Sequence, residues 1–300
     1  MNDQATRIFA IHGFSFRIPA TWELRVNKGY WGNGYQMFID HRTPTLNLTW
    51  ERFSRTPDYD RTVARMAKRA TQHSDLKVTK VEPITGSRQG LRVRLEGSEG
   101  VFHAAVLRPD PDVNLVLVIR QMLPGSALPL NRLVDSSHAL AEDAPTPWRF
   151  HGLALDLPPW WRLHGTEHMV GLTRAVWFHR PKNRLKTAGV LVLRRYACAS
   201  RILREITIDR WIEERLEKRE TMRQRAYASD GTFSAIADAP GLSPWRRLRG
   251  VREERHLAAW IEEGEDRLVV QEWKGAGPPL PPLRYPQDPK DGALPRMENT

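Results

Sequence analysis

The most constraining feature of this 300-residue chain is a thirteen-residue segment that occurs twice. Residues 12–24 return as residues 151–163, at a constant offset of 139 (151 − 12). Five positions are identical, and each apolar residue between them meets another apolar residue. In the first copy the identical positions are His12, Gly13, Pro19, Trp22 and Leu24. We therefore expect two copies of one domain.

Later landmarks repeat in the same order. His41-Arg42 corresponds to His179-Arg180, and the segment at His103 corresponds to the one at His256. The offset grows from 138 (179 − 41) to 153 (256 − 103), because surface loops accept insertions at small entropic cost. The predicted organisation is a first repeat over 1–143, a Pro-rich connector over 144–147, a second repeat over 148–275 and a Pro-rich, disordered tail over 276–300.

Each copy shows strand alternation followed by a helical pattern. Phe14, Phe16 and Ile18 alternate with polar residues, which is typical of a strand with one buried face. Asp58 is placed to cap a helix, and the second copy has helical spacing over 208–216. Antiparallel strands follow each helix. The sequence therefore predicts an α+β fold, with two tandem antiparallel sheets, each packed by one main helix and related by a pseudo-two-fold axis.

This unit of strand, hairpin, helix and closing meander resembles the Mog1/PsbP/DcrB-like α+β fold. The resemblance rests on the alternating strand with its proline and tryptophan, over 14–22 and again over 153–161, on the helix and on the meander. Within that fold, the nearest functional parallel is a dimeric chaperone that holds transmembrane segments of type VI secretion effectors. No binding residue of those chaperones matches a motif here, so the resemblance implies an architecture and no site.

Cysteine usage and hydropathy indicate a soluble, cytoplasmic protein. Cys198 is the single cysteine, so no intrachain disulfide can form. No secretory leader pattern stands at the N-terminus. The longest apolar run, Leu115–Ile119, is far shorter than the roughly 20 residues that span a bilayer. The net charge is +11, yet no segment concentrates it into a basic arm that would neutralise nucleic-acid phosphates.

One segment matches a metal-site pattern. His164, Glu167 and His168 fit the H-x-x-E-H pattern of a zinc peptidase, in which a helix brings both histidines to the metal. Gly165 and the preceding Trp-Trp strand end indicate a loop instead, and irregular backbone would not hold the required spacing. We therefore predict no metal site, and no motif for another cofactor is found.

Three pairs of histidines occupy equivalent positions in the two copies, namely His12 with His151, His41 with His179, and His103 with His256. None has an acidic partner at a spacing that predicts an orienting hydrogen bond, so structural hydrogen bonding is the preferred interpretation. No nucleophile elbow surrounds any serine, and no catalytic residue is predicted. An enzyme whose histidines converge only in three dimensions stays open as an alternative.

Basic and aromatic residues are interleaved in the second copy, at Arg194-Arg195 and over a predicted strand at 245–251. Tryptophan and arginine together can stack and hold single-stranded nucleic acid. The same alternation is typical of the solvent face of a strand. A nucleic-acid-associated protein is therefore a second alternative, and it would use Arg194, Arg195, Arg246, Arg247 and Arg249.

The sequence favours a non-enzymatic, cytoplasmic binding or adaptor protein with a protein partner. The partner would be engaged by the sheets of the two domains or by the groove that duplication creates between them, and no catalytic constellation is visible. The preferred form of this hypothesis is a chaperone that engages an apolar polypeptide segment of a secreted or membrane-associated partner. The oligomeric state does not follow from the sequence, although the two copies can act as a pseudo-dimer.

Overall fold

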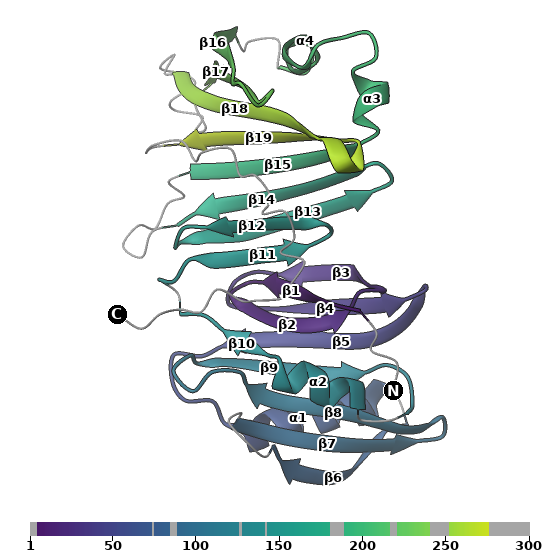
Figure 1. Cartoon of the computed structure of the whole chain (residues 1–300). Helices are drawn as coiled ribbons and strands as arrows, with labels where there is room; N and C mark the ends of the chain where they lie inside the picture. The colour runs from purple at the N-terminus through teal and green to yellow at the C-terminus, as the bar shows by residue number, and fades with distance from the viewer. Residues whose placement is uncertain are drawn as a thin grey trace. The chain divides into compact units, whose positions relative to one another are not determined.

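The computed structural model describes residues 5–73, 75–84, 89–125, 128–141, 143–180, 189–216, 221–240 and 252–275. The chain divides into two compact units, Met1–Pro159 and Trp160–Thr300 (Figure 1). The predicted tail over 276–300 and the predicted strand over 245–251 lie outside the described residues. No described helix is both long and apolar enough to cross a membrane.

The repeated His-Gly dipeptide is a hairpin turn. It joins β1 (Thr6–Ile11) to β2 (Phe14–Pro19), and its second occurrence joins β11 (Thr146–Phe150) to β12 (Leu153–Leu157). His12 and Gly13 have φ of 51° and 75°, and His151 and Gly152 have φ of 47° and 70°. A two-residue type I′ turn needs positive φ at both positions, which glycine adopts readily and histidine adopts more often than most residues. Turn geometry therefore accounts for the identity of this dipeptide in the two copies.

These two hairpins share one sheet in the first unit. Its strand order is β10-β2-β1-β11-β12, where β10 is His138–Ala139. The hairpins meet where β1 pairs with β11 antiparallel, Ala10 opposite Arg149. Those two positions are equivalent in the repeat (149 − 10 = 139), so a local two-fold axis passes between them. β11 begins inside the predicted connector at 144–147, and both β11 and β12 belong to the first unit.

The first unit also contains a seven-stranded antiparallel sheet with the order β3-β4-β5-β9-β8-β7-β6. Its strands are β3 (Trp22–Gly29), β4 (Asn33–Asp40), β5 (Thr43–Arg52), β9 (Leu115–Gln121), β8 (Gly100–Arg108), β7 (Gln89–Gly97) and β6 (Lys77–Pro83). The helices of this unit are α1 (Tyr59–His73) and α2 (Leu128–Asp135). The α1 side chains Val63 and Met66 pack on apolar residues of β7, β8 and β9.

The second unit contains a seven-stranded sheet with the same order, shifted by ten strands: β13-β14-β15-β19-β18-β17-β16. Its strands are β13 (Trp161–Met169), β14 (Leu172–His179), β15 (Gly189–Ala197), β19 (Arg267–Gly275), β18 (Arg252–Glu262), β17 (Phe233–Pro240) and β16 (Thr221–Tyr227). Even a bulge recurs, because the register shifts between Leu24 and Val26 in β3 and between Leu163 and Gly165 in β13. The sequence repeat is therefore matched by a repeat of strand topology.

The helix of the first copy begins where the sequence predicts it, whereas the helix of the second copy is shorter than predicted. Asp58 caps α1 as expected, since its Oδ1 accepts a hydrogen bond from the Arg61 backbone N–H at 3.0 Å. In the second copy, the helix predicted over 208–216 ends earlier, as α4 (Ile208–Glu213). The short helices α3 (Ala199–Ile202) and η1 (Glu263–Glu265) complete the unit.

The predicted α+β class is wrong, because the described chain is mostly β. It holds nineteen strands in three antiparallel sheets and only four α-helices, of 15, 8, 4 and 6 residues. The error has a physical origin. One helical stripe per copy was correctly located, but a helix of this length covers only part of a seven-stranded sheet. The Mog1/PsbP-like resemblance stays a prediction, without its main-helix layer.

Aromatic rings join the two sheets of the first unit. Phe38 of β4 is fully buried, and its ring centroid lies 4.9 Å from Phe9, 6.0 Å from Phe16 and 6.5 Å from Trp22. Phe9 and Phe16 belong to the hairpin sheet, so this cluster holds the hairpin against β3 and β4. The repeated tryptophans are core residues, since Trp22 and Trp161 are only 5% and 4% exposed.

Candidate functional site

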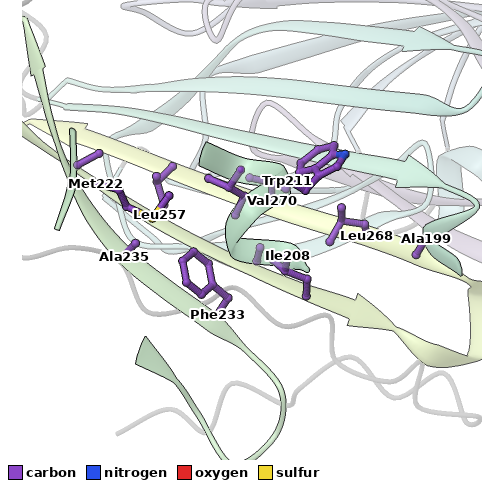
Figure 2. Packing of buried hydrophobic residues seen from close by; sticks show 12 residues of the cluster. Ala199, Ile208, Trp211, Met222, Phe233, Ala235, Leu257, Leu268 and Val270 are labelled. Atoms are coloured by element: carbon purple, nitrogen blue, oxygen red, sulfur yellow. The ribbon is translucent and has the colours of Figure 1, made fainter. Parts of the chain in front are cut away.

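Among the described residues of the second unit, α3 and α4 pack on one face of the sheet, mainly over β16, β17, β18 and β19. Ile208 and Trp211 of α4 pack against Leu268 and Val270 of β19 and against Phe233 of β17 (Figure 2). The same cluster includes side chains of β16 and β18. Strands β13, β14 and β15 continue this face beyond the helices. The part of this sheet face that α3 and α4 pack on therefore lies next to a part, over β13, β14 and β15, that contains a groove.

The groove has an apolar floor. Val176 and Phe178 of β14 and Val190 and Val192 of β15 lie on this face and line a cavity of about 690 Å³. Phe178 also stacks on His164 of β13, with ring centroids 4.2 Å apart. Because side chains alternate along a strand, Val176 and Phe178 of β14 point to the same face of the sheet, as do Val190 and Val192 of β15.

A charged cluster stands at the boundary between the groove and the helix-covered core. The carboxylate of Glu272, whose side chain is 6% exposed, receives Arg255 Nη2 at 2.6 Å and Arg194 Nη1 at 2.9 Å. Lys274 Nζ lies 3.4 Å from its other oxygen. Arg194, Arg255 and Lys274 are themselves 24%, 12% and 20% exposed. Three cations thus surround one carboxylate in a space where little water reaches them. We call these four residues the Glu272 cluster.

Electrostatics keep Glu272 ionised. Burial alone would raise its pKa, but the charges of Arg255, Arg194 and Lys274 lower it from 4.5 to about 2. The folded-state pKa is therefore below the unfolded-state value. Ionised Glu272 stabilises the folded chain above about pH 4.5, and this stabilisation is lost as the pH falls toward 2.

This sign gives a prediction for acid unfolding. The stability advantage of the wild type over Glu272→Gln should shrink by about 2 kcal/mol between pH 7 and pH 3, measured by urea denaturation at each pH. Glu82→Gln, which removes an exposed carboxylate paired with Lys80 in the first unit, is the control and should show little change. If the difference in free energy of unfolding between the wild type and Glu272→Gln is the same at pH 7 and pH 3, Glu272 is not held ionised by the three cations.

The structure places the H-x-x-E-H segment in a strand. His164, Glu167 and His168 lie on β13 and not in the predicted loop. Glu167 Oε1 pairs with Arg174 Nη1 at 2.8 Å, and His168 Nδ1 lies 2.9 Å from Thr173 Oγ1. His164 and Glu167 line the groove. Among the described residues, no group of three or more His, Cys, Asp or Glu side chains could hold a metal ion.

Arg194 and Arg195 point to opposite faces of β15. Arg194 joins the Glu272 cluster, whereas the Arg195 side chain is 6% exposed and binds Glu262 at 2.8 Å and Glu265 at 2.7 Å. Burial raises the pKa of Glu262 more than Arg195 lowers it. The structure therefore does not bring these two arginines to one surface. The other residues of the nucleic-acid alternative, Arg246, Arg247 and Arg249, lie outside the described residues.

The paired histidines occupy unlike environments. His12 is buried and stacks on Trp50 at 4.7 Å, whereas the side chain of His41 is 84% exposed in a turn. His103 donates its backbone N–H to Gln121 Oε1 at 3.2 Å, and burial lowers the pKa of its imidazole. In the second unit the ring centroids of His256 and Trp273 lie 5.2 Å apart. His151 forms the second hairpin turn, and the His179 ring stacks on Trp161 at 5.1 Å.

Sequence reasoning missed the groove. Of its charged residues, sequence reasoning singled out Arg194, which was assigned to nucleic acid together with Arg195, and Glu167, which was named only as part of the H-x-x-E-H pattern. Arg255, Glu272 and Lys274 come from two later strands and show no motif. The available signal was Glu272 inside the apolar strand β19, because a lone carboxylate in such a strand predicts a buried partner.

No protein-family model matches this chain, and no curated protein matches it. Two solved structures of the T6SS immunity protein TplEi from Pseudomonas aeruginosa are similar to this chain. The complex with "L" peptide has 9% identity and a TM-score of 0.35, covering 96% of this chain and 94% of that one. The apo structure has 11% identity and a TM-score of 0.31, covering 93% and 91%.

A crystal structure from Bacteroides thetaiotaomicron matches with 15% identity and a TM-score of 0.30. It covers 48% of this chain, which spans 52% of that protein's length. At these identities and TM-scores, none of the three assigns a fold or a function to this chain.

Proposed function

We propose that this chain is a non-enzymatic binding protein that holds an extended polypeptide segment in the groove over β13, β14 and β15. The observation that carries the proposal is the apolar floor of Val176, Phe178, Val190 and Val192, which lines the groove and does not belong to the cluster packed by the described helices α3 and α4. An apolar floor that is open to a groove favours association with apolar side chains of a partner.

The dimensions of the groove suit a peptide. Its lining residues come from β13, β14, β15, β19 and β18, together with Arg215 from the segment that follows α4. Four neighbouring strands alone, β14 to β18, span about 14 Å at roughly 4.8 Å between strands. About four residues of an extended chain cover that distance. Alternate side chains of such a segment would face the floor, as in other modes of extended-peptide recognition.

The apolar-segment chaperone favoured by the sequence is a narrower form of this proposal. The sequence left open whether the sheets or the groove between the copies would engage the partner, and the groove that supports the present proposal lies on the sheet of the second unit. The secreted or membrane-associated nature of the partner stays a prediction.

A direct test uses three immobilised pools of octapeptides with the purified full chain. In each pool leucine or valine alternates with one kind of polar residue: Asp or Glu in the acidic pool, Ser or Asn in the Ser/Asn pool, and Lys or Arg in the basic pool. Affinity is measured by biolayer interferometry. At least one pool should bind saturably. Val176→Gln should weaken that binding about fivefold, because a buried apolar contact is lost from the floor.

Val170→Gln is the matched control, since Val170 is fully exposed in the β13–β14 turn and does not line the groove. It should leave the affinity unchanged. Absence of binding to every pool, or equal weakening by the two substitutions, would refute the proposed function.

A further inference from the structure

On the β13 side, the groove is bordered by a pair of stacked rings. His164 is exposed, and its imidazole stacks on Phe178 at an interplanar angle of 19°. The guanidinium carbon of Arg180 also lies 5.7 Å from the centroid of the Phe178 ring. A Cβ added to Gly165, the next groove residue, would meet nothing within 4 Å, so there is open space over this part of β13. We call His164 and Phe178 the histidine platform.

A second flat group borders the groove on the side of the helices. Arg215 lines the groove, and its guanidinium carbon lies 3.8 Å from the centroid of the Trp211 ring. Its Nη1 donates a hydrogen bond to the Trp211 carbonyl oxygen at 3.1 Å, which holds the guanidinium over the indole. Trp211 is 5% exposed and packs with Val270 of β19 (Figure 2). Arg215 is exposed, so a flat cationic face is open to a ligand. We call Arg215 and Trp211 the arginine platform.

The two platforms lie about three strand spacings apart. His164 belongs to β13 and Trp211 packs over β19, and β14 and β15 lie between these strands. Three spacings of roughly 4.8 Å amount to about 14 Å, a distance that about four residues of an extended chain cover. Between the platforms, Val176 of β14 and Val192 of β15 are paired in register. An extended segment would therefore place side chains i and i+4 on the platforms and side chain i+2 on the valines, all from one face.

The first copy has other residues at the positions of the histidine platform. The bulge that contains His164 in β13 contains Arg25 in β3. Ile39 pairs with Glu23 as Phe178 pairs with Arg162, so Ile39 corresponds to Phe178. The sheet therefore forms without this ring pair. Aromatic groups that a sheet does not need for its own packing, and that line a groove, are typical of binding surfaces.

We infer that the groove of the second unit selects polypeptide segments with aromatic side chains at positions i and i+4 and an aliphatic side chain at i+2. The inference rests on the proposed function and adds the partner's chemistry. One aromatic ring would stack on His164. The other would lie on the face of Arg215, because a positive guanidinium and the negative face of a ring are electrostatically complementary. The aliphatic side chain would pack on Val176 and Val192.

Two other ligands suit the groove less well. A single-stranded nucleic acid needs a stacking surface for successive bases, whereas valines form the floor between the platforms. An acidic side chain would pair with Arg215 but would gain nothing from the ring pair on the other side of the groove. Both serve below as competing ligands.

Immobilised octapeptides test the inference with the purified full chain. The aromatic peptide has tyrosine at its positions 2 and 6, valine at position 4 and serine elsewhere, and the leucine peptide has leucine in place of both tyrosines. The aromatic peptide should bind about tenfold more tightly in biolayer interferometry. A third peptide, with tyrosines at positions 2 and 5, should lose most of this preference, because its two rings face opposite sides of an extended chain.

Substitutions in the two platforms should reduce the preference for the aromatic peptide. His164→Ala or Arg215→Gln should each lower the tenfold affinity ratio to about threefold, and the double variant should abolish it. His41→Ala and Arg65→Gln, at an exposed histidine and an exposed arginine of the first unit, are the matched controls and should leave the ratio at tenfold. A partial loss of folded protein cancels in this ratio, because both peptides are measured with the same sample.

The outcomes are distinguishable. If the aromatic and leucine peptides bind equally, the inference fails and the proposed function stands. If neither peptide and none of the pools binds, the proposed function fails as well. A tenfold preference that survives both platform substitutions would overturn the assignment of the rings to these platforms. Tighter binding of the acidic pool, or of a single-stranded oligonucleotide, would overturn the aromatic polypeptide as the ligand.

Discussion

Phe38→Ala should lower the free energy of unfolding of this protein by about 3–5 kcal/mol. Phe38 is fully buried, and its ring contacts Phe9 and Phe16 of the hairpin sheet and Trp22 of the large sheet. Truncation removes the apolar contacts and leaves a cavity where two sheets meet, and the surrounding rings are too rigid to fill it. Chemical denaturation followed by tryptophan fluorescence measures the change.

Tyr30→Ala is the control for this experiment. Tyr30 is also an aromatic residue of the first unit, but it is 59% exposed. Its truncation should cost about 1 kcal/mol or less. A loss for Phe38→Ala that is no larger than the loss for Tyr30→Ala would show that the aromatic cluster does not hold the two sheets together.

Gly13→Ala should cost about 2–5 kcal/mol, by two mechanisms that add. Gly13 has a φ of 75°, which strains any residue with a Cβ by about 1–2 kcal/mol. A Cβ at this position would also overlap the Trp31 ring and lie 2.7 Å from Arg52 Nη2. Relief of that overlap would shift buried groups at a further cost of about 1–3 kcal/mol.

Gly171→Ala separates the two mechanisms. Gly171 has a φ of 80°, but a Cβ there meets nothing within 4 Å. This variant should therefore lose only the backbone part, about 1 kcal/mol. The free energy of unfolding is measured by denaturant unfolding at a fixed pH. If the two substitutions lower it equally, the Trp31 and Arg52 side chains move aside at no energetic cost. The packing explanation of the first turn would then be wrong.

The sequence was informative where a local rule controls the structure. The alternation of Phe14, Phe16 and Ile18 located a strand with one buried face, and Asp58 located the start of α1. The conserved spacing of the repeat implied matching architecture, and the two large sheets have matching strand order. Each of these features depends on residues within a few positions of one another.

Features that depend on distant residues were missed. The fold class was wrong because helical spacing shows that a helix exists but not how much sheet it leaves uncovered. The Glu272 cluster joins Arg194 to residues on β18 and β19, and only strand pairing brings them together. The pairing of β1 with β11 was equally invisible, since neither strand carries a residue that specifies its partner.

The antiparallel pairing of Ala10 with Arg149 has an evolutionary consequence. A polypeptide with only one copy of the repeat would carry the same hairpin with its first strand unpaired along one edge. Such an edge is self-complementary about a two-fold axis, so two identical chains could join through it as a homodimer. Fusion of two genes would have made that association permanent and independent of concentration. Each half was then free to change on its own. The Glu272 cluster, whose Arg255 corresponds to the buried Phe102 of the first copy, is the kind of asymmetry that a homodimer cannot acquire.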